Sequence, residues 1–349
     1  MREGSHTWQE ILSQPQVWRG TLEAFAERRR ELERFLSQSD LSSVLIVGCG
    51  STHYLAQSAA VLLSRRAGLL ARALPSSELW LYRDAVPADR ALLIAVSRSG
   101  VTTETVRAVE RFRAAVGRPV LVITCYPESI LAQEADFALV APDGRERGVA
   151  QTRSFTSMLL LTQALAALLA REEGMLEHLY RLPNALEGLV SRLGDLSQRL
   201  GSDLDIERFF FLGGGPLYGL ANEAMLKTKE LSLSHAEAYH PLEFRHGPMS
   251  VVNRRTLVVG LLSDTGLMEE WRVLEEMSRL GARTLALVED IPVSSRWRAD
   301  QVVELHSGLD EWERGPLYLP VIQRLAYHRA VAKGLDPDRP NNLKPVVEL

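Results

Sequence analysis

The chain has 349 residues, and 40 lysines and arginines nearly balance 44 acidic residues, which gives a net charge of -4. This length predicts two or three domains, and a hydrophobic fraction of 46% excludes a disordered chain. The slightly acidic balance argues against a nucleic-acid partner, and two cysteines, Cys49 and Cys125, are too few for a disulfide scaffold.

The first 40 residues predict a helical leader, because Val17, Leu22, Phe25 and Leu32 recur near the 3.6-residue helical period. Short apolar runs then alternate with helical patterns, which predicts βαβ units and a parallel sheet. The expected strands of this first half are residues 44–47, 91–96, 120–124 and 137–140. The expected helices are residues 54–66, 102–115 and 152–171.

The same alternation returns in the second half of the chain. The expected strands there are residues 209–212, 256–262, 284–288 and 302–305, and the expected helices are 267–280 and 316–333. Gly48 and Gly213, and likewise Ser97 and Ser263, recur about 165 positions apart in the same context, which predicts a duplicated α/β domain. We expect a helical leader over 1–40, a first domain over 41–171, a helical linker over 172–205, a second domain over 206–335 and a tail over 336–349.

Hydroxyl side chains follow two strands of the first half. In open α/β sheets ligands lie beyond the carboxyl ends of the strands, where helix N-termini suit anions. The hydroxyl residues are Ser51, Thr52, Ser97, Ser99 and Thr102. They could instead cap helices. As a cluster they favour a small phosphorylated ligand, since neither a dinucleotide-binding glycine pattern nor a Walker motif accompanies them.

The second half replaces two of these hydroxyls by Pro216 and Leu217 and gains charged side chains. Lys227 and Glu230 are three residues apart and share a helix face, and His246 follows further on. Such a set can provide an acid, a base and an electrostatic stabiliser. The spacing alone equally fits a surface helix with ion pairs, so both interpretations stay open at this point.

Seven motifs, in order along nearly the whole chain, give it a resemblance to a known family. They are Gln9-Glu-Ile-Leu-Ser-Gln-Pro15, Val47-Gly-Cys-Gly-Ser-Thr52, Ser97-Arg-Ser-Gly-Val-Thr102, Glu223-Ala-Met-Leu-Lys-Thr-Lys-Glu230, His235-Ala-Glu-Ala-Tyr239, Glu243-Phe-Arg-His-Gly-Pro248 and Asp336-Pro-Asp-Arg-Pro340. The chain resembles the sugar-isomerase (SIS) family in its double-domain form, including the isomerase half of glucosamine-6-phosphate synthase and related sugar-phosphate deaminases and isomerases. This resemblance implies two tandem, doubly wound, flavodoxin-like parallel-sheet domains.

The resemblance also implies roles for individual residues. The positions that match phosphate-binding loops are Ser51, Thr52, Ser97, Arg98, Ser99 and Thr102. Val149 and Gln151 lie in a segment similar to the loop that contacts the sugar, with Gln151 where the family usually has serine. Glu230 matches the base that moves a proton between C1 and C2, and Lys227 matches a lysine beside it. His246 matches a ring-opening histidine contributed by the neighbouring subunit, which implies a homodimer with shared active sites.

Two features depart from the synthase pattern. The chain opens Met1-Arg2-Glu3, with no cysteine to act as the N-terminal nucleophile of a glutamine-hydrolysing domain, so we expect no glutamine-fed synthesis by this chain alone. In the tail, the synthase-like pattern places its Schiff-base lysine one residue after Lys344, where Pro345 stands. Lys344 is therefore a candidate for this role and equally an exposed tail lysine.

We expect an isomerase or deaminase that acts on a hexose or amino-sugar 6-phosphate by C1–C2 proton transfer. The alternative is a non-catalytic sensor that binds a sugar phosphate. We expect neither a cofactor nor a metal, because His235, His240 and His246 show no standard ligand spacing. The longest apolar stretch, residues 157–170, falls short of the ~20 residues of a membrane span. With no secretory signal in the first residues, we expect a cytoplasmic protein without a membrane partner.

Overall fold

The fold is described from a computed structural model, which describes residues 6–39, 41–82, 90–291 and 299–344. The chain divides into two compact units, each built around one five-stranded sheet. The described residues of the first-half unit are 13–39, 41–82, 90–146, 151–183 and 344. The described residues of the second-half unit are 6–12, 147–150, 184–291 and 299–343. The predicted leader is thus divided, since its first helix belongs to the second-half unit.

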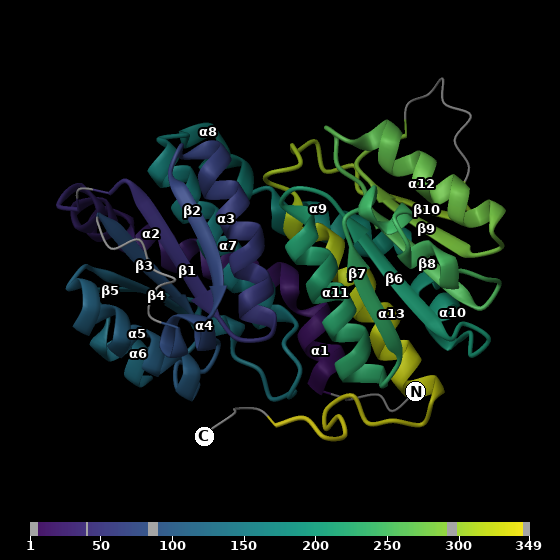
Figure 1. Ribbon diagram of the computed structural model, residues 1–349, viewed down its shortest axis with the longest axis horizontal. Helices are drawn as coiled ribbons and strands as arrows, with labels where there is room; N and C mark the ends of the chain where they lie inside the picture. Colours follow the sequence, from purple (N-terminus) through teal and green to yellow (C-terminus); the bar gives the residue numbers. More distant parts are fainter. Residues whose placement is uncertain (1–5, 40, 83–89, 292–298, 345–349) are drawn as a thin grey trace. The chain divides into compact units, whose positions relative to one another are not determined.

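The first-half unit contains a parallel sheet with the strand order β2-β1-β3-β4-β5 (Figure 1). The strands are β1 (Ser43–Gly48), β2 (Leu70–Pro75), β3 (Ala91–Val96), β4 (Val120–Thr124) and β5 (Phe137–Val140). The three central strands are almost continuously apolar because helices bury both of their faces.

Helices cover both faces of this sheet (Figure 1). The helices are α2 (Gln14–Ser37), α3 (Ser51–Arg66), α4 (Ser76–Leu81), α5 (Thr103–Val116), α6 (Ile130–Glu134), α7 (Arg153–Ala170) and α8 (Glu173–Leu179). On one face, Phe112 of α5 and Leu131 of α6 pack against Leu93 and Val122 of the strands. Helices α3 and α7 pack against each other and against β1 and β4.

By length and composition alone, the whole of helix α7 could cross a membrane. This differs from the expectation for its apolar stretch, residues 157–170, which is too short to do so. Within the protein, 78% of this helix is buried. Helices of this kind occur in membranes and in protein cores alike, and here tertiary packing covers the apolar surface.

The second-half unit repeats this topology, with the strand order β10-β9-β8-β6-β7. Its strands are β6 (Arg208–Gly213), β7 (His235–Tyr239), β8 (Thr256–Leu261), β9 (Arg283–Val288) and β10 (Gln301–Glu304), all parallel. Its α-helices are α1 (His6–Leu12), α9 (Leu182–Leu193), α10 (Leu196–Ser202), α11 (Leu217–Ser232), α12 (Leu267–Arg279) and α13 (Tyr318–Ala332). Short 3-10 helices are η2 (Pro142–Gly144) in the first-half unit and η3 (Glu243–Arg245), η4 (Pro248–Val251) and η5 (Gly315–Leu317) in the second-half unit.

Both sheets follow the flavodoxin-like order 2-1-3-4-5 when the strands of each unit are numbered along the chain, so the second strand of each unit lies at the sheet edge beside the first. The prediction of two tandem α/β domains with doubly wound parallel sheets is therefore confirmed. The sequence analysis misses only the strands β2 and β7 among those that the structure describes. Both are edge strands with a single buried residue each, so they lack the apolar run that marks the central strands.

Candidate functional site

The loops after β1 and β3 lie at the same edge of the first-half sheet. These two strands pair in parallel from Ser43 with Ala91 to Val47 with Ala95. The chain leaves β1 toward β2 on one side and returns to β3 on the other, so the two loops mark the topological switch point of the sheet. Open α/β sheets bind their ligands at this point.

The loop after β1 is a tight turn that begins α3. Gly50 has a φ of 55° and a ψ of -122°, a conformation that side-chain-bearing residues rarely adopt. The Thr52 hydroxyl donates to the Cys49 carbonyl at 3.0 Å and accepts from the Cys49 amide at 2.9 Å. Thr52 thus closes the turn with its own side chain. The Ser51 hydroxyl, in contrast, has no hydrogen-bond partner among the residues that the structure describes.

The loop after β3 gathers three hydroxyls. The Ser97 hydroxyl accepts from the Gly100 amide at 3.1 Å and lies 3.4 Å from the Thr102 hydroxyl. Thr102 occupies the N-cap position of α5, but its side chain makes no capping hydrogen bond. The Ser99 hydroxyl accepts weakly from Val101 at 3.4 Å. No acceptor within the described ranges takes a hydrogen bond from the Ser99 amide or hydroxyl. These donors suit a ligand that brings its own oxygen atoms.

Arg98 contributes positive charge to the same loop. Its guanidinium lies 3.6 Å from the Glu146 carboxylate, which is fully buried. Glu146 accepts from the Thr152 amide and hydroxyl, both at 2.6 Å, and from the hydroxyl of Ser154. One buried carboxylate therefore connects the loop after β3 to the start of α7. Sequence reasoning does not single out Glu146.

Gln151 precedes α7 in the first-half unit. Its Oε1 atom is buried and has no hydrogen-bond partner in the part of the chain that the structure describes. Buried polar atoms are nearly always paired, and an unpaired one is often found where a ligand group or a water supplies the missing partner.

Helix α11 of the second-half unit carries the candidate acid–base residues. Lys227 is 0% exposed, and its Nζ atom pairs with the Glu230 carboxylate and lies 3.4 Å from Oε1 of Glu223. The Glu223 side chain is 0% exposed, whereas that of Glu230 is 16% exposed. Two carboxylates share one ammonium group, and Glu230 is the member with access to solvent. The charged helix face is therefore mostly buried rather than a solvated surface face.

Glu223 begins one of the family motifs, but its role could not be predicted from that motif alone. Its position four residues before Lys227 is the signal that could have identified it, because residues at this spacing are neighbours on a helix. A lysine buried against two carboxylates holds Glu230 in a fixed orientation.

The structure brings three candidate segments of the second-half unit together in one apolar cluster. Ala150, Leu231 and Ala326 are buried in it, and Leu343 packs against them. Ala150 adjoins Val149, Leu231 adjoins Glu230, and Leu343 precedes the exposed Lys344. Pro345, which stands at the synthase lysine position, lies outside the described residues.

His246 is not a member of this apolar cluster. It follows η3 and is exposed, and its ring has no hydrogen-bond or ion-pair partner in residues 6–39, 41–82, 90–291 and 299–344. Its neighbour Arg245 pairs with Glu276 at 2.8 Å. An exposed, unpaired imidazole is available to a ligand or to a second chain.

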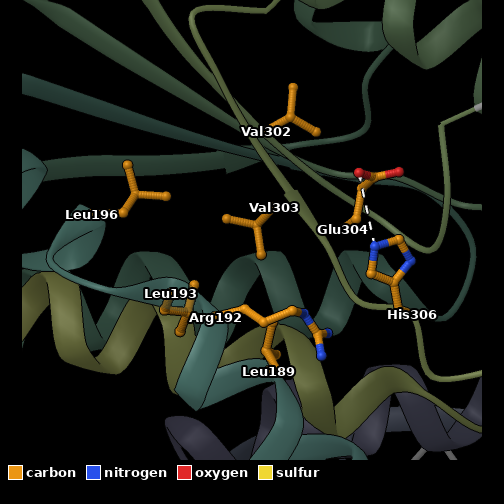
Figure 2. Close-up of a pocket in the computed structure, with 8 residues that line it drawn as sticks. All are labelled: Leu189, Arg192, Leu193, Leu196, Val302, Val303, Glu304 and His306. Atoms are coloured by element: carbon orange, nitrogen blue, oxygen red, sulfur yellow. Dashed lines mark ion pairs between the residues drawn. The ribbon is translucent and has the colours of Figure 1, made fainter.

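A further pocket of about 200 Å³ lies between α9, α10 and β10 (Figure 2). It is lined by Leu189, Arg192, Leu193, Leu196, Val302, Val303, Glu304 and His306. Two of its lining residues, Glu304 and His306, lie close enough to Asp290 for the three side chains to hold a metal ion, a grouping that the sequence does not predict. Ion pairing accounts for their proximity, since Nε2 of His306 lies 3.9 Å from Glu304 and Nδ1 lies 2.5 Å from Asp290. None of the predicted site residues lines this pocket.

Comparison with known proteins gives a consistent result. The sequence matches the family model of the SIS domain over residues 36–168 and 204–309. Glutamine–fructose-6-phosphate aminotransferase (isomerizing) from Legionella pneumophila is 33% identical over 309 residues, which are 87% of this chain and 50% of the relative. The chain thus spans about half the length of the curated relatives it matches.

Two solved structures cover nearly the whole chain. Tagatose-6-phosphate ketose/aldose isomerase from Escherichia coli matches with a TM-score of 0.88 and 27% identity, over 99% of this chain and 96% of the other. Glucosamine-6-phosphate deaminase from Thermotoga maritima matches with a TM-score of 0.80 and 28% identity, over 99% of this chain and 100% of the other.

Proposed function

Because the chain belongs to the SIS domain family, we propose that it is a phosphosugar isomerase or deaminase that acts on a hexose or amino-sugar 6-phosphate. The observation that carries this proposal is the buried Lys227, which pairs with a carboxylate that keeps access to solvent, Glu230. A module that only binds a sugar phosphate has no need of this charged cluster. The proteins similar in structure include a ketose/aldose isomerase and a deaminase of sugar 6-phosphates.

We propose that the loops after β1 and β3 bind the phosphate. Ser97, Ser99 and Thr102 supply hydroxyl donors, Ser51 a further hydroxyl, and Arg98 a positive charge. Thr52 acts indirectly, because its hydroxyl holds the turn after β1. The buried Oε1 of Gln151 would accept a hydrogen bond from a hydroxyl or amino group of the sugar.

We propose that Glu230 is the general base. Its carboxylate removes the proton from C2 of the open-chain aldose, and the electron pair shifts to form an enediol between C1 and C2. The C1 oxygen takes up a proton as the C2 hydroxyl gives one up, and the same carboxylic acid returns the first proton to C1, which gives the ketose with all atoms conserved. For a 2-amino sugar the product is a C2 imine, which takes up one water and releases ammonia. Lys227 pairs with the Glu230 carboxylate and orients it toward the substrate.

We propose that His246 of a second copy of the chain assists ring opening, in a homodimer with shared active sites. An imidazole changes charge near neutral pH and suits this role. Within the described part of this chain, its ring has no partner, which leaves it available. Mixing Glu230→Gln protein with His246→Ala protein should restore activity, because one site of each mixed dimer is intact. No recovery after verified subunit exchange contradicts the shared site.

The decisive experiment supplies a panel of hexose 6-phosphates and amino-sugar 6-phosphates in deuterated water. We expect ketose formation or ammonia release from one member and deuterium at C1 or C2 of the recovered sugar. Glu230→Gln should abolish both signals. Glu110→Gln is the matched control, because Glu110 also pairs at three residues' spacing on a helix, with Arg107 at 2.9 Å. Saturable binding without turnover or exchange for every sugar would support the sensor instead.

A further inference from the structure

Two of the sequence motifs, around Gln9-Glu10 and Asp336-Pro-Asp338, have no part in the proposed chemistry. The structure brings both to the loop that contains Gly148 and Val149. The Glu10 carboxylate, 4% exposed, accepts from the Arg147 amide at 2.6 Å and from the Gly148 amide at 3.3 Å. A side chain of α1 thus holds two successive amides of the proposed sugar-contacting loop.

The fit around Gly148 is close. A Cβ atom at this position would lie 2.8 Å from Oε2 of Glu10 and 2.9 Å from Oγ1 of Thr7. Real Cβ atoms do not approach other atoms this closely, so the side chains of Glu10 and Thr7 leave no room for a side chain at position 148. Glycine at position 148 is what allows the backbone to reach the carboxylate.

The C-terminal tail in turn holds α1. The Asp338 carboxylate accepts from the Thr7 amide at 2.7 Å and from the His6 amide at 3.0 Å, and the Thr7 hydroxyl donates to the Pro337 carbonyl at 3.1 Å. Burial raises the pKa of Asp338, but hydrogen bonds from Thr7 and His6 outweigh it and bring this pKa below its usual range. The Asp338 carboxylate is therefore held charged where it caps α1.

The side chain of Trp8 fixes the other face of α1. Its ring lies 4.8 Å from that of Tyr327 and 5.1 Å from that of His328, both on α13. Helix α1 therefore has a rigid support on the second-half unit, which is what a residue needs in order to place another segment within a fraction of an ångström.

We propose that Glu10 is a positioning residue for the loop at Gly148 and Val149, and that Asp338 acts through it by fixing α1. The proposal rests on the proposed function, because the loop is the proposed sugar-contacting segment. Ala150 of the same loop packs with Leu231, the neighbour of Glu230, so a displaced loop also disturbs the surroundings of the base. A displacement of about 1 Å at such a place costs on the order of 10²-fold in rate.

The test uses Glu10→Gln, Glu10→Ala and a matched control. In Glu10→Gln the amide oxygen can still accept from Arg147, but the second acceptor and the charge are lost. Asp300→Ala is the control, because Asp300 accepts from the Thr284 amide at 2.8 Å and hydroxyl at 3.0 Å in the same unit, without touching the loop. Hydrogen exchange at the Arg147 and Gly148 amides is measured together with kcat, KM and Tm.

We expect exchange at both amides to rise and kcat to fall by about 10–100-fold in Glu10→Ala, with Glu10→Gln between this variant and the wild type. KM should change less than about threefold, because the phosphate contacts stay. Asp338→Ala should also raise exchange at both amides and lower kcat, by less than Glu10→Ala does. Asp300→Ala should lower Tm without raising exchange at Arg147 or lowering kcat.

Unchanged exchange at both amides in Glu10→Ala overturns the proposal. So does a loss of kcat in Asp300→Ala as large as that in Glu10→Ala at equal Tm, because it would show a general effect of destabilisation. If no sugar phosphate is turned over by the wild type, the proposed function fails. Exchange at the two amides with and without fructose 6-phosphate then still decides the role of Glu10: we expect protection by the sugar in the wild type and none in Glu10→Ala.

Discussion

The loops after β3 and β8 occupy equivalent places in the two units but differ in what satisfies their donors. Both share one internal bond, since Ser97 accepts from Gly100 at 3.1 Å and Ser263 accepts from Gly266 at 2.9 Å. The Thr265 amide and hydroxyl donate to the Glu311 carboxylate at 3.0 and 2.6 Å. The equivalent donors of Ser99 have no acceptor in the described residues.

A second carboxylate, that of Glu270, also distinguishes the loop after β8 from the loop after β3. Glu270 accepts from the Ser263 amide at 2.7 Å and from its hydroxyl at 3.0 Å. The loop after β8 also carries Asp264, paired in bidentate fashion with the buried Arg314, where the loop after β3 carries Arg98. The chain's own carboxylates thus take the donors of Ser263 and Thr265 in the loop after β8, whereas Glu146 pairs with Arg98 and leaves the Ser99 donors without an acceptor in the described residues. A loop of the right shape becomes an anion site only if its donors are left for the ligand.

The largest expected effect compares Glu230 on helix α11 with Arg65 at the equivalent position on helix α3. Glu230→Gln keeps the shape and removes the base, so kcat should fall by roughly 10²–10⁴, with KM for the phosphosugar nearly unchanged. Arg65 takes the place of Glu230 on α3, and Arg65→Gln should leave kcat within about twofold of the wild type. Steady-state kinetics checks both. Normal turnover by Glu230→Gln would remove the enzyme proposal.

The next effect tests the two loops. Replacing Ser97 and Ser99 together by alanine should weaken phosphosugar binding by about 1–3 kcal/mol, or about 5–150-fold in KM. The counterpart, Ser263 and Thr265 both to alanine, should lower stability but leave KM unchanged, because their donors already serve Glu270 and Glu311. Calorimetric titration with the sugar phosphate gives the same comparison without turnover. Equal losses of affinity in both pairs would contradict the assignment of one anion site to one loop.

The smallest effect concerns the pH dependence of stability. Burial raises the pKa of Glu270 above its ordinary 4.5, although hydrogen bonds from Ser263 oppose this. The folded state therefore binds this proton more tightly than the unfolded state, and the resulting stabilisation is complete below pH 4.5 and is lost as the pH rises through the folded value.

The difference in free energy of unfolding between the wild type and Glu270→Gln should accordingly fall as the pH rises above 4.5. Urea unfolding at several pH values measures it. A difference that is flat or rises with pH would show that the Ser263 hydrogen bonds outweigh burial. Ser97 donates to no carboxylate within the described residues, so Ser97→Ala should show no corresponding pH dependence.

The sequence by itself determined the features that are encoded locally. Apolar runs and their spacing predicted the duplicated parallel α/β units and every central strand, because a strand buried on both faces must be apolar throughout. Glycine and hydroxyl patterns after these strands predicted which loops to examine, since the strand–turn–helix geometry fixes where they lie. Helical spacing predicted that Lys227 and Glu230 are neighbours, and the structure adds that the lysine is buried.

Only the tertiary structure decided the contacts between distant segments. The strands β2 and β7 lack the apolar signal because neighbours on one side alone bury them. Glu311 reaches Thr265 across 46 positions, Glu10 reaches Arg147 across 137, and Asp338 reaches Thr7 across 331. A carboxylate is chemically the same on a solvated face and at a backbone amide, so its neighbours in space alone decide whether it occupies a loop, positions one or acts as a base.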